Sequence, residues 1–200
     1  TGNNNTLGSI GSMDIAFDKV GTDVNDSFSG NFNTANADKF RGGGGDDLLT
    51  GYRGADLLMG DAGNDEIRGG NGKDVLMGGD GADDLYGGFG MNTFAGELDG
   101  EIDKIYFKSD EHAYNWLYAS DGNQDGSKVD VIGALDAFDE IEMLGISDDR
   151  ITCLGGVNTS IQGKEYNGIG IFADGTLEAL YTGGNLSADQ LNNMTTGVLI

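Results

Sequence analysis

Residues 42–95 read GGGGDDLLT, GYRGADLLM, GDAGNDEIR, GGNGKDVLM, GGDGADDLY and GGFGMNTFA, six units of nine residues with no insertion between them. Every unit has glycine at its first and fourth positions and an aliphatic or aromatic residue at its eighth. The sixth positions are Asp47, Asp56, Asp65, Asp74, Asp83 and Asn92. The first- and fourth-position glycines of the first five units are Gly42, Gly45, Gly51, Gly54, Gly60, Gly63, Gly69, Gly72, Gly78 and Gly81. A fixed period of this kind indicates a structure built from stacked repeats.

Each unit combines a turn with a short strand. Glycine reaches positive φ without a Cβ clash, so positions one to six are predicted to turn sharply. Positions seven to nine then form a strand whose middle side chain, always Leu, Ile or Phe, points into the core. Two units complete one coil, and successive coils stack at the strand spacing of about 4.8 Å. The sequence therefore predicts an all-β solenoid.

Stacking of the coils brings like charges together. Asp47, Asp65 and Asp83 are predicted to line one edge of the solenoid, and Asp56, Asp74 and Asn92 the other. Carboxylates about 5 Å apart repel one another. A hard divalent cation between successive turns removes the repulsion, because Ca²⁺ takes about six to eight oxygens from carboxylates and backbone carbonyls alike. We expect about four to six calcium ions, at one or two per coil interface.

The repeated unit resembles the glycine- and aspartate-rich nonapeptide of the RTX (repeat-in-toxin) proteins. The resemblance implies a right-handed parallel β-roll, with the sixth-position side chains and the carbonyls of the glycine-rich turns as calcium ligands. The segment KVDVIGALDAFDEIEML (128–144) is similar to the stretch that follows the repeats in secreted RTX proteases, where it covers the last coil. A disordered Gly-Asp-rich linker is the alternative, but it does not need an apolar residue at every ninth position.

Two imperfect units precede the repeat. Residues 21–29 (GTDVNDSFS) keep Asp26 at the sixth position, and residues 33–41 (NTANADKFR) keep Asp38 but have asparagine at positions one and four. Residues 30–32 then form an insertion between the two units. Asparagine tolerates the left-handed region better than most residues, so we expect both units to continue the roll. The predicted divisions are an N-terminal flank (1–20), the calcium-binding roll (21–95) and a C-terminal region (96–200).

The C-terminal region is predicted to be a mainly β cap. Alternating apolar runs indicate strands at 102–107, 129–132, 141–144, 151–154, 169–173 and 176–181. Asp174-Gly175 is a hairpin signal, and Ser187 with Gln190 forms a capping box that opens one short helix. A cap is physically required, because the last coil of a solenoid has open strand edges.

A second calcium motif and several loop acids lie in this region. Asp121, Asn123 and Asp125 match the first half of an EF-hand loop, but its twelfth position is Ile132 and not Glu. The segment is therefore either a separate calcium site or an Asp-Gly turn. The other acids of the region, Asp99, Glu101, Asp103, Asp136, Asp139 and Glu140, are interpreted as solvated loop residues.

Composition limits the partners of the chain. The 34 acids against 11 bases give a formal charge of −23, which opposes binding to nucleic acid or to an anionic membrane surface. No apolar run approaches the length of a membrane span. The single cysteine, Cys153, allows no internal disulfide and is predicted to be a small buried hydrophobe. The sequence starts at Thr1 and not at Met, without a signal-peptide pattern, so it is expected to be a piece of a larger protein. Its end, TTGVLI, is similar to the uncleaved tails of type I-secreted RTX proteins.

The sequence carries no recognisable catalytic motif. There is no H-E-x-x-H and no G-x-S-x-G, and the only histidine, His112, is interpreted as a surface or interface residue. A glycosidase pair among the many acids is an open alternative, but the repeat already explains those acids. Tyr114, Trp116 and Tyr118 alternate, so they form either an exposed binding face or one buried strand face.

These patterns predict a non-catalytic, calcium-binding RTX module of a larger secreted or surface protein. It is expected to fold on meeting extracellular calcium and to support export by the type I machinery. The rival interpretation is a calcium-dependent glycan- or protein-binding (adhesion) module. Asp65 and Asp74, in mid-roll, are expected to matter more than Asp47 or Asp83. Met59 and Met77 are expected to be covered, and less exposed than Thr50 and Arg68.

Overall fold

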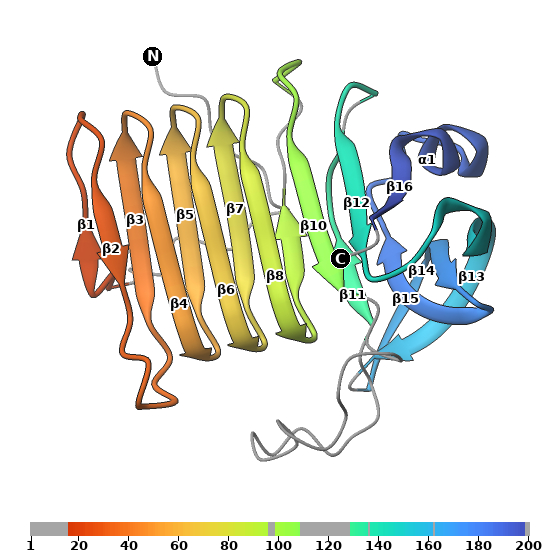
Figure 1. Ribbon diagram of the computed structural model, residues 1–200, viewed down its shortest axis with the longest axis horizontal. Helices are drawn as coiled ribbons and strands as arrows, with labels where there is room; N and C mark the ends of the chain where they lie inside the picture. The colour runs from red at the N-terminus through yellow and green to blue at the C-terminus, as the bar shows by residue number, and fades with distance from the viewer. Residues whose placement is uncertain (1–15, 96–98, 109–128, 136, 162, 199–200) are drawn as a thin grey trace.

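The computed structural model describes residues 16–95, 99–135, 137–161 and 163–198 except for 109–128, and two sheets dominate it (Figure 1). The nine-stranded sheet contains, in spatial order, β1 (Lys19–Val20), β3 (Lys39–Gly44), β5 (Leu57–Ala62), β7 (Val75–Asp80), β9 (Thr93–Ala95), β11 (Asp130–Ile132), β15 (Thr176–Tyr181), β14 (Lys164–Ala173) and β13 (Ile151–Ile161). The seven-stranded sheet contains β16 (Thr195–Val198), β12 (Glu140–Leu144), β10 (Lys104–Lys108), β8 (Asp84–Gly90), β6 (Glu66–Gly72), β4 (Leu48–Gly54) and β2 (Ser27–Ser29). A 3-10 turn (Asp148–Arg150) and the helix α1 (Ala188–Met194) complete the described elements.

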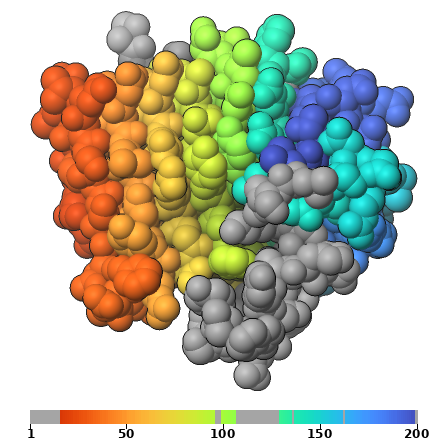
Figure 2. Space-filling model, in the orientation of Figure 1, coloured from red at the N-terminus to blue at the C-terminus, as the bar shows by residue number. Residues whose placement is uncertain are grey.

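Consecutive units of the repeat alternate between the two sheets. Each strand pairs in parallel with the strand two units further along, as in Leu49 opposite Ile67 and Leu58 opposite Leu76. The coils therefore stack as adjacent bands from one end of the molecule to the other (Figure 2). This arrangement confirms the predicted all-β, parallel β-solenoid.

The core is a double row of the eighth-position side chains. They lie between the two sheets with an exposed fraction of zero: Leu49, Leu58, Ile67, Leu76, Leu85 and Phe94. Phe40 from the imperfect second unit extends the row toward the N-terminus. Burial of each such side chain is worth about 1.5–3 kcal/mol, so the eighth position supplies much of the driving force for coiling.

The parallel sheets continue past residue 95. β10 pairs in parallel with β8 and then with β12, and β11 joins β9 to β15. Ile105, Ile132 and Ile141 take the inward positions there, each with an exposed fraction of zero. The solenoid thus continues after the nine-residue repeat has ended. Its short strands are still present there, but the connections between them are longer.

The C-terminal elements close this end of the solenoid. β13, β14 and β15 form an antiparallel unit, and β14 and β15 turn at Asp174 and Gly175 as predicted. The Ser187–Gln190 capping box is present at the start of α1. Cys153 is buried in the core as predicted, and burial raises the pKa of its thiol to about 11.

The outer faces of the two sheets differ in exposure. Met77 has an exposed fraction of 7%, and Met59 is half-buried, as are its neighbours Leu57 and Val75. On the other sheet Arg68 is exposed and Thr50 is half-buried. The expected order therefore holds for Met77, whereas Met59 and Thr50 fall in the same range.

Candidate metal centre

The sixth-position side chains form two hydrogen-bonded ladders along the edges of the roll. One carboxylate oxygen, Oδ1, accepts the backbone N–H of the equivalent residue in the preceding coil. Asp65 Oδ1 lies 2.7 Å from the nitrogen of Asp47, and Asp83 Oδ1 lies 2.8 Å from that of Asp65. On the other edge Asp74 accepts from Asp56 at 3.0 Å. Each aspartate is thereby held in one orientation by the coil before it.

The ladders extend beyond the nine-residue repeat in both directions. Asp103 accepts the N–H of Asp83 at 3.0 Å, and Asp139 accepts the N–H of Asp103 at 3.1 Å. The interpretation of these two acids as solvated loop residues is wrong, because their exposed fractions are 0% and 2%. Asp130 continues the second edge by accepting the N–H of Asn92 at 2.6 Å.

These three missed residues share a local signal. Each stands two positions before an inward isoleucine, in the order Asp-x-Ile or Asp-Val-Ile, as the sixth position stands before the eighth in every repeat. Asp83 is consequently not at the end of a stack. The expectation that it matters less than Asp65 loses its premise, since both have a ladder partner on either side.

The second carboxylate oxygen, Oδ2, is the unusual atom. In the five repeat aspartates, Asp47, Asp56, Asp65, Asp74 and Asp83, Oδ2 is buried and makes no hydrogen bond to any residue that the structure describes. A buried carboxylate oxygen with no partner carries a substantial desolvation cost. Each repeat therefore presents an acceptor that a cation can satisfy.

The first-position glycines explain where these oxygens lie. A Cβ on Gly60 would lie 2.0 Å from Asp65 Oδ2 and 2.6 Å from the carbonyl oxygen of Gly78 in the next coil. Gly42, Gly51 and Gly69 show the same two neighbours, a carboxylate oxygen and a carbonyl oxygen of the next coil. The first glycine is required for this close approach, whereas the fourth is required for its conformation, as at Gly63 with a φ of 130°.

Burial makes the repeat carboxyls weaker acids, because it raises their pKa values. Desolvation raises the pKa of Asp56 and Asp65 from 3.8 to about 6, against the opposing effect of the ladder hydrogen bond. The pKa of Asp74 rises to about 7 and that of Asp83 to about 8, again chiefly through desolvation. The pKa of Asp47 is also raised by burial. These groups resist ionisation unless a positive charge lies next to them.

The donor set fits calcium bound through carboxylate and backbone oxygens together. Among the described residues, no three His, Cys, Asp or Glu side chains gather at one point. A cation at these turns must therefore take its remaining oxygens from the backbone, and a first-position carbonyl of the next coil lies close to the same glycine as the carboxylate oxygen. A set of carboxylate and carbonyl oxygens is hard, and it suits Ca²⁺ better than it suits the softer transition metals.

Two members of the ladders, Asp26 and Asn92, differ from the five repeat aspartates. Asp26 Oδ2 is already occupied, since it accepts the N–H and hydroxyl of Thr22. Asn92 accepts the N–H of Asp74 through Oδ1, which leaves its buried Nδ2, a donor, where the aspartates have Oδ2. The side chain of Asn92 thus presents a donor where the aspartates present an acceptor, and calcium binding at Asn92 stays a prediction.

The second imperfect unit also has a different boundary. A Cβ on Gly30 would lie 2.2 Å from Asp38 Oδ2 and 2.3 Å from the carbonyl of Gly51, as for the first glycine of a repeat. Gly30, and not Asn33, thus takes the first position of the Asp38 unit. The three additional residues lie within its turn rather than between units. Asp121, Asn123 and Asp125 lie outside the described residues.

The fold and the ladders together define a parallel β-roll with cation-binding turns. A family model of the RTX calcium-binding nonapeptide repeat (four copies) matches residues 32–67 and again residues 59–94. This part of the chain consists of RTX calcium-binding repeats. No curated protein and no solved structure matches the chain. Among the described residues, no helix has the length and hydrophobicity of a membrane span.

Proposed function

We propose that this chain is a non-catalytic module whose roll folds when calcium is bound, in the manner of a metal-coupled folding domain. The buried, unpartnered Oδ2 atoms of the five repeat aspartates carry the proposal. About four to six ions are expected, held by these oxygens and by the carbonyls of the first-position glycines. Calcium would supply the positive charge that the buried carboxylates lack.

The energetics favour a calcium-free chain that does not complete its roll. One pKa unit corresponds to about 1.4 kcal/mol, so ionising Asp74 and Asp83 above their raised pKa values costs on the order of 10 kcal/mol together. A whole domain is usually stable by only about 5–15 kcal/mol. The formal charge of −23 adds self-repulsion to this cost.

A calcium requirement of this kind suits a protein that is exported unfolded. We propose that the chain is the C-terminal part of a larger secreted or surface protein, that it passes the type I machinery before folding, and that external calcium then drives folding. The repeats support this proposal, because calcium is scarce in the cytosol and plentiful outside the cell. The upstream domain and the secretion machinery are the partners expected from it.

Far-UV circular dichroism tests the coupling directly. The chain in EDTA is expected to give a largely coil spectrum, and CaCl₂ to restore the β spectrum, whereas MgCl₂ at equal concentration restores much less. Magnesium is the matched control, because it prefers a rigid octahedral shell with several waters. A native β spectrum in EDTA would contradict calcium-coupled folding.

A further inference from the structure

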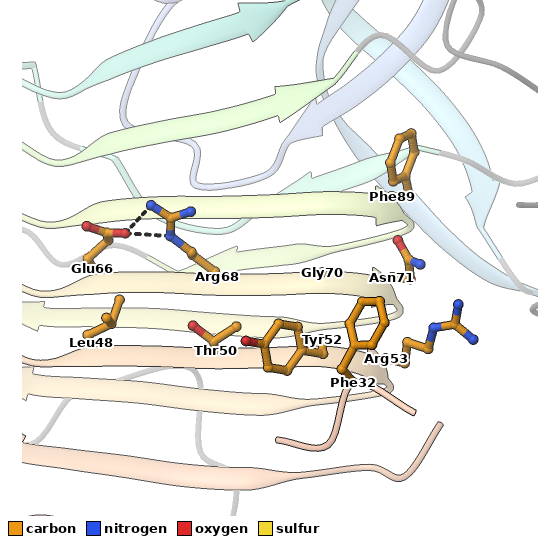
Figure 3. Close-up of a pocket in the computed structure, with 10 residues that line it drawn as sticks. All are labelled: Phe32, Leu48, Thr50, Tyr52, Arg53, Glu66, Arg68, Gly70, Asn71 and Phe89. Atoms are coloured by element: carbon orange, nitrogen blue, oxygen red, sulfur yellow. Dashed lines mark hydrogen bonds and ion pairs between the residues drawn. The ribbon is translucent and has the colours of Figure 1, made fainter. Parts of the chain in front are cut away.

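We infer that the outer face of the seven-stranded sheet carries a binding site for a neutral sugar ring, formed by a hollow of about 540 Å³ over β4, β6 and β8 (Figure 3). Its lining combines aromatic rings with planar polar groups: Phe32, Tyr52, Phe89, Arg53, Arg68, Glu66 and Asn71. The volume suits one or two sugar rings, since small-molecule sites span about 300–1,000 Å³. The inference needs only the folded roll and goes beyond the calcium role.

The hollow exists because two glycines interrupt a row of side chains. Tyr52 lies in register with Gly70 and then with Gly88 on the neighbouring strands. Neither glycine has a side chain, so this row is open beyond Tyr52, and the neighbouring Gly70 lines the hollow. Arg68 lies on one side of this gap and Asn71 on the other (Figure 3).

Two departures from the repeat meet at this place. The second position is glycine at positive φ in several units, as at Gly70 and Gly88, but it is Tyr52 with a φ of 74°. A tyrosine in the left-handed region stores strain, which is commonly kept where it serves a site. The second departure is the group of extra residues in the turn of the Asp38 unit. Phe32 is one of these residues, and its ring contacts that of Tyr52.

The aromatic pair is exposed and held in place. Phe32 and Tyr52 meet edge to face with ring centroids 5.7 Å apart, and their exposed fractions are 62% and 38%. The Arg53 guanidinium lies 5.7 Å from the Phe32 centroid. Rings fixed in this way offer apolar faces to a ligand at little cost in side-chain entropy.

The polar groups favour a neutral sugar over an anion or a peptide. Arg68 is paired with Glu66 and also lies 5.1 Å from the ring centroid of Tyr86, so its charge is already balanced. The other lining cation, Arg53, lies against the Phe32 ring, and the formal charge of −23 on the chain opposes an anionic ligand. Arg68, Glu66 and Asn71 together offer donors and acceptors in flat groups, which suits neighbouring hydroxyls. The floor strand β6 pairs on both sides, with β4 and β8, and therefore has no open edge for a peptide strand.

Saturation-transfer NMR on the calcium-loaded full chain tests the site. The probes are maltose, cellobiose, lactose and N,N′-diacetylchitobiose, with digalacturonic acid and a Tyr- and Leu-containing hexapeptide as the other classes. At least one neutral disaccharide is expected to receive saturation. Preference for the acidic sugar or for the peptide, or transfer to none of the probes, overturns the inference.

The chain offers a matched pair of variants. Tyr52→Gly restores the residue that the repeat uses at this position, so it should fold at least as well and bind the sugar about tenfold more weakly. Asp61→Gly relieves the same kind of strain, since Asp61 has a φ of 80° on the other sheet, and should bind as the parent does. Phe32→Ala, in an exposed turn, should weaken binding like Tyr52→Gly. Unchanged binding in Tyr52→Gly and Phe32→Ala overturns the assignment of the site.

Discussion

Replacement of Asp83 by asparagine should have opposite effects on stability with and without calcium. Asparagine keeps the ladder, because Asn92 accepts the N–H of Asp74 through Oδ1 in the same position of the repeat. It also removes a carboxyl whose pKa burial raises from 3.8 to about 8. Asp83→Asn should therefore stabilise the calcium-free roll and weaken the calcium-bound one.

The magnitude follows from the same shift. Above about pH 8 the ionised Asp83 destabilises the calcium-free fold by up to about 6 kcal/mol, at about 1.4 kcal/mol per pKa unit. Relaxation of the turn and residual hydration reduce the gain, so we expect Asp83→Asn to recover a few kcal/mol in EDTA. In calcium the variant loses a ligand, and its midpoint of calcium-induced folding should move to higher calcium.

Two titrations followed by circular dichroism near pH 9 measure both effects. In EDTA the calcium-free chain is driven to fold with the osmolyte trimethylamine N-oxide (TMAO), which strengthens burial, and in CaCl₂ the folded chain is unfolded with denaturant. Asp80→Asn is the matched control, because it makes the same change in net charge at an exposed position. It should shift neither condition by more than about 0.5 kcal/mol. The reasoning is refuted if, in EDTA, Asp83→Asn needs as much TMAO to fold as the parent chain does.

Three further predictions concern pH, the turns and the core. Because the carboxyl pKa values are raised, the calcium-free roll binds more protons than the unfolded chain. Its stability should therefore fall as pH rises from about 4 to 8, while the affinity for calcium rises. Thermal melts and calcium titrations at several pH values check these two trends. Gly60→Ala should abolish most calcium-induced folding, because its Cβ would lie 2.0 Å from Asp65 Oδ2, whereas Gly155→Ala, with nothing within 4 Å, should fold normally in the same titration. Ile67→Ala should cost about 2–5 kcal/mol in calcium, measured by denaturant unfolding, and a loss below 1 kcal/mol would argue against a tightly packed inner row.

The repeat made the fold predictable, because the eighth residue of every nine-residue unit is apolar and must point into the core. Leu49, Ile67 and Leu85 pair in register as the period required. The position of Oδ1 was not predictable from spacing, since the period places Asp65 above Asp47 but does not say which backbone group it meets. The ladder hydrogen bond and the buried Oδ2 are properties of the stacked coils, so they appear only in three dimensions.

The extension of the ladders was harder to predict for a different reason. Asp103 and Asp139 stand 20 and 36 residues from their ladder partners instead of 18, so a search for a fixed period loses them. The feature that these coils still share with the repeat is local: an aspartate stands two residues before an inward-pointing apolar residue, here isoleucine. The role of Gly30 was missed for the same reason, because the turn that follows it holds three more residues than the turn of a repeat unit.

A crystal structure of the calcium-loaded chain, with anomalous diffraction data collected for calcium, tests the central claim most directly. Peaks are expected in the turns beside Oδ2 of the repeat aspartates, within about 2.3–2.6 Å of those oxygens and of backbone carbonyl oxygens. Within the nine-residue repeat, Asp47, Asp56, Asp65, Asp74 and Asp83 present that atom buried and without a hydrogen-bond partner among the described residues. Oδ2 atoms that hydrogen-bond to protein or water, with no anomalous peak in the turns, would contradict the account.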